Sequence, residues 1–192
     1  MKKLFVVAFA FASSTFAMAQ NWNFDKSHSN VKFSVTHMMV SETEGKFKKF
    51  SGTLDAKEAD FKDAKIDFTI DVASIDTDDD QRDGHLKSAD FFDVATYPSI
   101  TFKSTSFTKT GANTYKLTGN LTMRGVTKTV SFDVTGGKSI KDPYGFTRVG
   151  FKIKGLINRI DYGVKWNAAV EAGGMVVSEN VDFTANVEFT KK

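Results

Sequence analysis

Apolar and polar residues alternate along most of the chain. In the clearest run, 65–72, charged and hydroxyl residues alternate with Ile66, Phe68, Ile70 and Val72. A period of two is typical of a β-strand that turns one face to a core and the other to water. The same pattern predicts strands at 31–36, 115–123, 130–134, 149–153 and 181–189, and less regular runs predict further strands at 44–56, 98–107 and 161–171.

Short clusters of turn residues separate the predicted strands. They are Gly111-Ala112-Asn113, Gly136-Gly137, Asp142-Pro143-Tyr144-Gly145 and Gly173-Gly174. Glycine, proline, asparagine and aspartate favour tight turns. About eight strands joined in this way, without a βαβ rhythm or an internal repeat, predict an all-β antiparallel sandwich or barrel. We expect residues 20–192 to form a single domain.

The alternation stops in the segment 75–98. Thr77 followed by Asp80 resembles a capping box, and the acidic residues 78–80 stand where the positive end of a helix dipole favours them. We therefore predict one or two short helices near residues 78–93. They would lie across one end of the barrel, as a plug or a lid.

The first residues have the features of a secretory signal peptide. Residues 1–3 form a basic start, an apolar run covers 4–12, and Ala17-Met18-Ala19 fits a cleavage site. The apolar run is too short to span a bilayer. We expect residues 1–19 to be cleaved after Ala19 and the remaining chain to be exported.

Composition narrows the classes of function. The sequence has no cysteine, so packing and backbone pairing must hold an exported chain without disulfides. Loss of Lys2 and Lys3 with the leader would lower the formal net charge from +3 to +1. A nearly neutral chain without a Lys/Arg cluster does not favour nucleic-acid binding.

Phenylalanine is strongly enriched, with 19 Phe against 4 Tyr and 2 Trp. Phenylalanine has no polar group, so it fills cores and forms apolar walls. The segment 85–104 concentrates apolar residues, among them Leu86, Phe91, Phe92, Tyr97 and Phe102. Two interpretations stay open at this point: a Phe-rich packed core, and the wall of a pocket for an apolar ligand.

The sequence contains no strong motif for catalysis or metal binding. The acidic run that begins at Asp76 lacks the Gly and Glu of an EF-hand loop, because Gln81 and Lys87 occupy those positions. There is no G-x-S-x-G elbow and no cysteine nucleophile. Zinc-like spacing is absent among the three histidines, His28, His37 and His85. We predict no catalytic residue, no metal and no cofactor.

Two places could provide a polar end for a pocket. Arg159 and Asp161 are two residues apart, so on a strand they would share one face, with Trp166 nearby. If that face is inward, the charges need each other or the head group of a ligand. A structural ion pair and a head-group contact both stay open. His37 continues the inward face of the strand predicted at 31–36.

Five segments resemble the YceI-like proteins. They are "DKSHSNVKFSVTHMMV" (25–40), "GKFKKFSGTL" (45–54), "SIDTDDDQRDGHLKSADFFDVATYPSITFKS" (74–104), "GNLTMRGVTKTVSFDV" (119–134) and "INRIDYG" (157–163). The resemblance covers almost the whole chain after the leader. It implies a lipocalin-like, eight-stranded antiparallel barrel in the periplasm, whose cavity holds a polyisoprenoid of the quinone or prenyl-phosphate type.

With this resemblance, the aromatic and aliphatic residues predicted to face inward become the expected wall of a ligand site. We expect the polar end of that site at His37, Arg159 and Asp161. The predicted apolar binding residues are Phe33, Val35, Phe47, Phe68, Ile70, Leu86, Phe91, Phe92, Tyr97, Phe102, Phe132, Phe151 and Trp166.

The leading hypothesis is an exported carrier that sequesters an isoprenoid lipid and is not an enzyme. One alternative is a packed periplasmic interaction or stress-response module without a stable ligand. Another is an enzyme that acts on a lipid-like substrate, with His37 or His85 as acid or base. Transient contact with a membrane or a membrane protein, and a homodimer, stay open.

Overall fold

The computed structural model describes residues 21–171 and 173–192. Most of this part of the chain is extended. The strands are β1 (Asn21–His37), β2 (Ser41–Phe47), β3 (Phe50–Asp55), β4 (Lys65–Asp71), β5 (Ile75–Asp76), β6 (Ser99–Lys109), β7 (Thr114–Met123), β8 (Val126–Lys141), β9 (Thr147–Asn158) and β10 (Asn180–Lys191). Helix α1 (Asp80–Lys87) and two 3₁₀ turns, η1 (Val72–Ser74) and η2 (Arg159–Tyr162), interrupt them.

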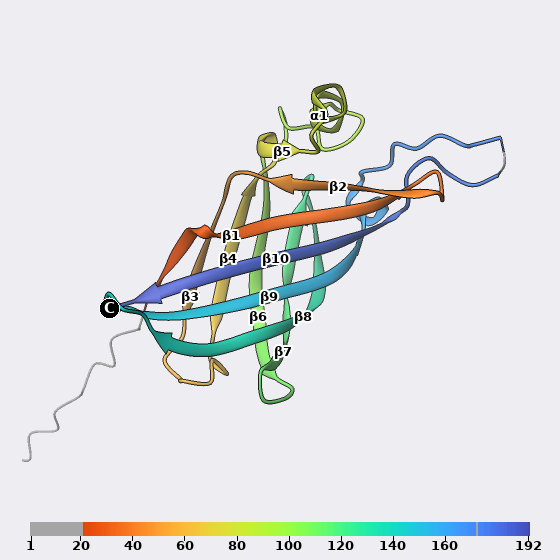
Figure 1. Ribbon diagram of the computed structural model, residues 1–192. Coiled ribbons are helices and arrows are strands. Elements are labelled where there is room, and N and C mark those ends of the chain that lie inside the picture. Colours follow the sequence, from red (N-terminus) through yellow and green to blue (C-terminus); the bar gives the residue numbers. More distant parts are fainter. Residues whose placement is uncertain (1–20, 172) are drawn as a thin grey trace, which may run out of the picture.

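The strands form a closed antiparallel barrel. Their order is β10-β9-β8-β7-β6-β4-β3-β1, and β10 pairs again with β1 to close the sheet (Figure 1). β2 and β3 both pair with the same neighbour, β1, and act as one strand broken at residues 48–49. β4 and β5 are joined in the same way through η1. The predicted eight-stranded antiparallel barrel is confirmed.

The alternation in the sequence corresponds to the two faces of this barrel. In β7 the inward residues Tyr115, Leu117, Leu121 and Met123 are buried, and the outward residues that alternate with them are exposed or half-buried. A bulge between Asp25 and Asn30 shifts the register of β1. Between these two residues β1 advances five positions while β10 advances two, and an odd number of extra residues reverses which side chains face inward.

The predicted helix near residues 78–93 is confirmed as α1, but its cap differs from the prediction. Asp79 is the N-cap, and its carboxylate accepts a hydrogen bond from the backbone N–H of Arg82 at 2.9 Å. Thr77 instead donates its hydroxyl to the buried carboxylate of Asp83 at 2.6 Å. The interaction ties the start of the helix to the barrel end through β5.

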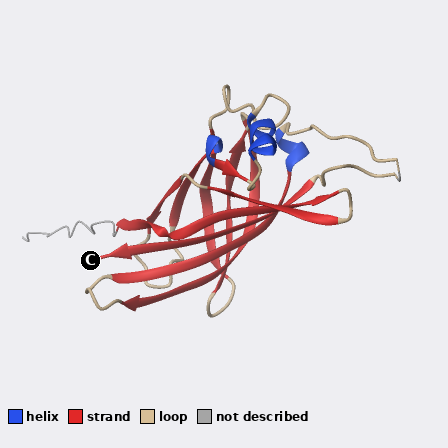
Figure 2. Cartoon of the chain, turned by 45° about the horizontal axis from the view of Figure 1, so that its top comes forward, coloured by secondary structure: helices blue, strands red, loops and turns tan. Residues whose placement is uncertain are grey.

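The strand predicted at 161–171 is wrong. β9 ends at Asn158, whose side chain accepts a hydrogen bond from the N–H of Ile160 and begins η2. Gly163 then closes η2 with φ +78°, a conformation that glycine adopts without strain. The chain continues as an irregular loop up to β10. This loop, α1 and η2 all gather at one end of the barrel (Figure 2).

The opposite end is closed by the connection between β3 and β4. Phe61 from this connection is only 1% exposed, and its ring centroid lies 5.6 Å from Trp22 and 5.2 Å from Phe151. Phe107 and Tyr115 stack beside it with centroids 4.6 Å apart.

The predicted leader, residues 1–19, lies outside the described residues. Among those that are described, no helix is long and apolar enough to cross a membrane.

Candidate functional site

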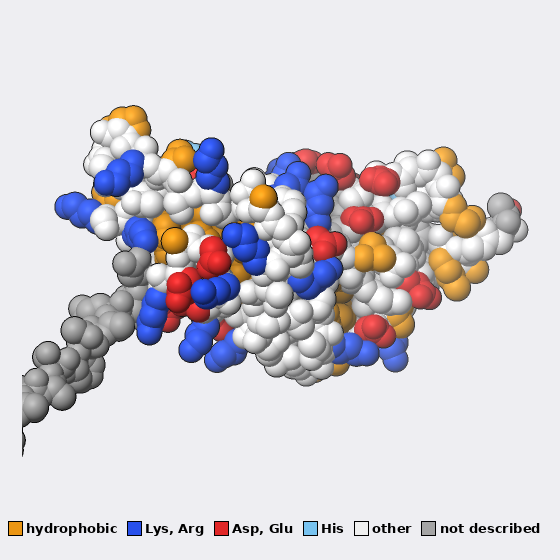
Figure 3. Space-filling view, turned by 90° about the horizontal axis from the view of Figure 1, so that it is seen from below, with side chains coloured by type: hydrophobic (Ala, Val, Ile, Leu, Met, Phe, Trp, Pro, Cys, Tyr) orange, Lys and Arg blue, Asp and Glu red, His pale blue; other side chains and the backbone are white. Residues whose placement is uncertain are grey.

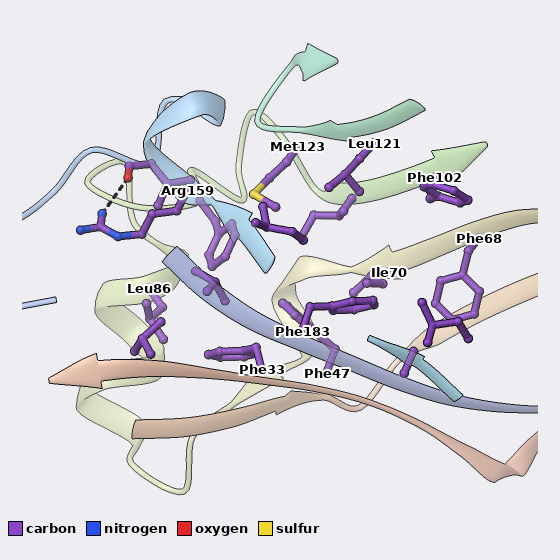
Figure 4. A pocket seen from close by; sticks show the side chains of 18 of the residues that line it. Phe33, Phe47, Phe68, Ile70, Leu86, Phe102, Leu121, Met123, Arg159 and Phe183 are labelled. Atoms are coloured by element: carbon purple, nitrogen blue, oxygen red, sulfur yellow. Dashed lines mark hydrogen bonds between the residues drawn. The ribbon is translucent and has the colours of Figure 1, made fainter. Parts of the chain in front are cut away.

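The barrel encloses a cavity of about 600 Å³. Inward side chains from most of the strands line it, and Figure 4 shows aromatic rings and aliphatic chains pointing into it from opposite walls. Eleven phenylalanines take part: Phe33, Phe47, Phe68, Phe91, Phe92, Phe102, Phe107, Phe132, Phe151, Phe183 and Phe189. The Phe-rich composition therefore forms the wall of a space rather than a solid core.

Glycines in the barrel wall leave room for four of these rings. Each ring lies over a glycine of a neighbouring strand, and a Cβ built there would come closer than 3.0 Å to the ring. Covering of a strand glycine by an aromatic ring is a known device of β-sheets. It keeps the rings against the wall and the centre of the barrel open. The pairs are Phe33 with Gly45, Phe68 with Gly52, Phe102 with Gly119, and Phe132 with Gly155.

The cavity has a closed apolar end. Phe107 and Phe151 line it there, and behind them pack Phe61, Trp22 and Tyr115, all almost fully buried. A ligand tail in the barrel would meet this aromatic layer at its far end.

The other end of the cavity is polar. Helix α1 and the turn before it contribute the side chains of Asp79, Gln81, Arg82 and His85, and the hairpin of β1 and β2 contributes His37. The ring of His85 lies edge-on to Phe91 and Trp166, with centroids 5.0 and 5.1 Å away. Its Nε2 lies 3.1 Å from a carboxylate oxygen of Asp90. The cavity thus has an apolar tube and a mouth with hydrogen-bonding groups.

Arg159 at this mouth is a structural residue. It is 4% exposed, and its guanidinium donates to the backbone carbonyls of Ser178 (2.8 Å), Val164 (2.7 Å), Trp166 (2.8 Å) and Val177 (3.2 Å). Desolvation by burial lowers the pKa of Arg159, but a guanidinium remains charged at physiological pH. The side chain holds together the loop that follows η2 (Figure 4).

Arg159 and Asp161 do not form the ion pair that was one of the two interpretations of these residues. The strand that would have placed them on one face ends at Asn158, so the two side chains diverge. Asp161 is exposed, and its carboxylate lies 3.4 Å from Nζ of Lys128. It does not reach the cavity.

Fourteen of the residues predicted for the site line the cavity: Phe33, Val35, His37, Phe47, Phe68, Ile70, Leu86, Phe91, Phe92, Phe102, Phe132, Phe151, Arg159 and Trp166. Tyr97 does not, because its ring packs over Gly125 outside the tube. That the fourteen bind a ligand stays a prediction. The prediction missed Leu117, Leu121, Met123, Val187 and Phe189, although the alternation of β7 and β10 places all of them inward.

A cluster with the composition of a metal site lies away from the cavity. One ligand atom each from Asp25, His28 and Glu188 lies within 4.8 Å of the others. The guanidinium of Arg148 reaches into this cluster, 2.9 Å from Asp25 and 2.6 Å from Glu188. The guanidinium of Arg148 thus supplies the positive charge that a metal ion would otherwise supply, and the cluster is explained as an ion-pair network.

Comparison with known proteins places the fold. The profile of the family described as "YceI-like domain" matches residues 22–189. A UPF0312 protein of Staphylococcus aureus is 38% identical over 171 residues, which cover 88% of this chain and 97% of the relative. The crystal structure of BcnA from Burkholderia cenocepacia has a TM-score of 0.75 and 29% identity, covering 86% of this chain and 99% of BcnA.

A second similar structure carries a functional description. It is a polyisoprenoid binding domain from Saccharophagus degradans, implicated in plant cell wall breakdown. Its TM-score is 0.66 at 15% identity, and the match covers 91% of this chain and 99% of that domain. At this identity the likeness shows a shared fold.

Proposed function

The chain belongs to the YceI-like family, and from this we propose that it is an exported protein that sequesters or carries a polyisoprenoid lipid, of the quinone or prenyl-phosphate type, in its barrel cavity. The observation that carries the proposal is the cavity itself. It is apolar over most of its length, closed by aromatic rings at one end, and polar at the other.

The physical match is between an amphipathic ligand and these two ends. Burying apolar groups is favourable by about 0.8 kcal/mol per methylene, so a long tail supplies most of the binding free energy. Cavities of roughly 300 to 1,000 Å³ are typical of small-ligand sites, and this one lies in that range. The polar mouth near His37, Arg82 and His85 would face a quinone or phosphate head group. Affinity should therefore depend more on the tail than on the head.

The hollow interior also bears on the alternatives. A module that acts only through its outer surface would fill its barrel with side chains, as small barrels commonly do. The four glycines beneath phenylalanine rings instead keep the centre open. A binding role is also favoured over catalysis, because His37 and His85 lie at the mouth, at the polar margin of an otherwise apolar space.

We further propose that residues 1–19 direct export and that the protein acts in the periplasm, in brief contact with a membrane from which an isoprenoid is taken. The lipid itself is the proposed partner. Isoprenoids reside in membranes, so a carrier must meet a bilayer at least when it loads.

The proposal is tested by native mass spectrometry of the protein isolated from the periplasm of its own host, followed by organic extraction of the bound lipid. We expect a stoichiometric prenyl species. A clean apo mass under gentle conditions would overturn the proposal in favour of an interaction module.

Variants make the test site-specific. Phe102→Asp and Phe132→Asp each place a charge inside the tube and should abolish lipid uptake. Tyr144→Asp is the matched control, because Tyr144 is an aromatic residue that is 82% exposed. Circular dichroism must first show that the cavity variants fold. Intact uptake by a folded Phe132→Asp protein would show that the lipid binds elsewhere.

A further inference from the structure

Two loops beside the cavity mouth end in exposed apolar side chains. Met38, Met39 and Val40 form the turn between β1 and β2, and they are 43%, 62% and 86% exposed. Met175, which is 52% exposed, lies in the loop before β10. These four residues are called the apolar tip. In Figure 1 the two loops project together from the barrel, at the end away from the C-terminus.

The two loops are bound to one another. The N–H of Met38 donates to the carbonyl of Val176 at 2.8 Å, and His37 and Val177 form an isolated β-bridge. The side chain of Met39 packs over Gly174 of the second loop. The tip is therefore one built surface and not two independent turns.

The turn carries methionine where the backbone favours other residues. Met38 and Met39 have φ of +50° and +61°, and the N–H of Val40 donates to the carbonyl of His37 at 3.0 Å. Positive φ at both central residues defines the hairpin turn that Asn-Gly or Asp-Gly fits best. Methionine is strained there, and Met38 and Met39 stay 43% and 62% exposed despite the contact of Met39 with Gly174. Such a choice is explained if the side chains are buried by something outside the chain.

The apolar character of the tip continues into the cavity. Val176 and Val177, which follow Met175, line the cavity, as does His37, which precedes Met38. An apolar chain leaving a membrane could pass along these residues into the tube without crossing water. A protein partner would require a broad complementary face, whereas this tip is the narrow end of a projection (Figures 1 and 2).

The charged residues beside the apolar tip indicate which kind of lipid surface it fits. Glu42, Glu44, Glu171 and Glu179 all lie within four residues of a tip residue and are exposed. In the space-filling view, acidic side chains accompany the apolar ones at this end of the molecule (Figure 3). Anionic lipids attract basic segments and repel acidic ones. The tip therefore fits an electrically neutral lipid surface better than an anionic one.

We propose that the apolar tip inserts into the surface of a zwitterionic bilayer and holds the cavity mouth there during lipid transfer. The transfer step rests on the function proposed above, whereas insertion does not.

Binding to the bilayer is tested by flotation of the protein without residues 1–19 with phosphatidylcholine vesicles, with and without phosphatidylglycerol. We expect wild-type protein to float with neutral vesicles, and less with anionic ones. Met39→Asp/Val40→Asp and, separately, Met175→Asp should reduce flotation at least tenfold. The matched control is Ile140→Asp/Tyr144→Asp, which places charges on exposed apolar residues at the opposite end of the barrel and should float as wild type does.

A second measurement separates this inference from the proposed function. Uptake of an extracted prenyl lipid from detergent micelles should be equal in wild type and Met39→Asp/Val40→Asp, while uptake from vesicles should be slower in the variant. If neither the wild type nor the variant takes up lipid from detergent, the proposed carrier function fails. Flotation alone then decides whether the apolar tip binds a bilayer. Equal flotation of tip variants and wild type would overturn the inference. So would a wild type that does not float but forms a dimer lost in Met39→Asp/Val40→Asp, because a second copy would then cover the tip.

Discussion

The ring of Phe132 on β8 lies over Gly155 of β9, where a Cβ would collide with it. On the other side of Gly155, Phe183 of β10 stands directly opposite in the sheet register. The two rings meet with centroids 5.5 Å apart. One glycine of β9 thus lets two phenylalanines from the strands on either side of it, β8 and β10, lie along the wall, and the lumen beside them stays open.

Replacing this glycine should narrow the tube. In Gly155→Ala the new methyl group displaces the ring of Phe132, because both cannot occupy the same wall position. Overpacking of this kind costs roughly 1 to 3 kcal/mol. We expect a lower free energy of unfolding, measured in urea. We also expect the substitution to weaken the binding of long prenyl chains more than the binding of short ones.

Two further variants show whether the collision with the ring of Phe132 causes the loss of stability and binding in Gly155→Ala. Gly155→Ala/Phe132→Leu removes the colliding ring and should recover both stability and binding. Gly150→Ala is the matched control on the same strand, since a Cβ there would have only the carbonyl oxygen of Val187 nearby, at 3.9 Å. A Gly150→Ala protein as impaired as Gly155→Ala would contradict the explanation.

The barrel could be predicted from the sequence because the alternation that indicates each strand lies within that strand's own residues. Alternation at 65–72 or 115–123 indicates a strand and its buried face without knowledge of any neighbour. The glycine-and-ring pairs depend instead on register. Gly119 can be recognised as an inward position, but that the ring of Phe102 covers it follows only from the pairing of β6 with β7.

The polar end of the site was predicted less well because one capping residue changes the geometry. The side chain of Asn158 ends β9, so the spacing of Arg159 and Asp161 no longer places them on one face. An Asn at a possible strand end, directly before Arg159, was the signal available in the sequence. Tyr97 failed for a different reason: the segment 88–98 has no period from which its direction could be read.

Phe61 should be the most sensitive residue at the closed end of the barrel. Its side chain is 1% exposed and contacts the rings of Trp22 and Phe151. Removing a buried aromatic ring typically costs 3 to 5 kcal/mol, so we expect Phe61→Ala to lower the free energy of unfolding by about 4 kcal/mol. Urea denaturation measures this.

Tyr144→Ala provides the comparison, because Tyr144 is 82% exposed and a change of less than about 0.5 kcal/mol is expected there. If Phe61→Ala were no more destabilising than Tyr144→Ala, the connection between β3 and β4 would not be an integral part of the barrel end.

Arg159→Lys should release the loop at the cavity mouth. A lysine ammonium cannot reproduce the planar guanidinium that serves four backbone carbonyls, and some of these would be left without a donor. Hydrogen bonds to charged groups contribute about 1.5 to 3 kcal/mol each, so we expect a loss of roughly 3 kcal/mol. Hydrogen exchange at residues 164–178 should become faster. Asp161→Asn should leave exchange there unchanged, since Asp161 contacts Lys128 and not Arg159.

Arg148 should govern the stability of the barrel in acid. Its guanidinium contacts the carboxylates of Asp142 (2.7 Å), Asp25 (2.9 Å) and Glu188 (2.6 Å), and so links β1, β9, β10 and the turn before β9. The hydrogen bond from Arg148 lowers the pKa of Asp142. Hydrogen bonds from Ser27 and His28, together with Arg148, lower the pKa of Asp25.

A lowered pKa means that the folded state favours the charged carboxylate. The stabilisation is complete above the ordinary aspartate pKa of about 3.9 and is lost as the pH falls towards the lowered values. The urea midpoint of wild type should therefore fall steeply between about pH 4 and pH 2. In Arg148→Met the three carboxylates repel one another at neutral pH, and protonation relieves this repulsion. We expect a lower midpoint at pH 7 and a shallower decline in acid. Parallel pH profiles for the two proteins would show that Arg148 does not set the acid limit.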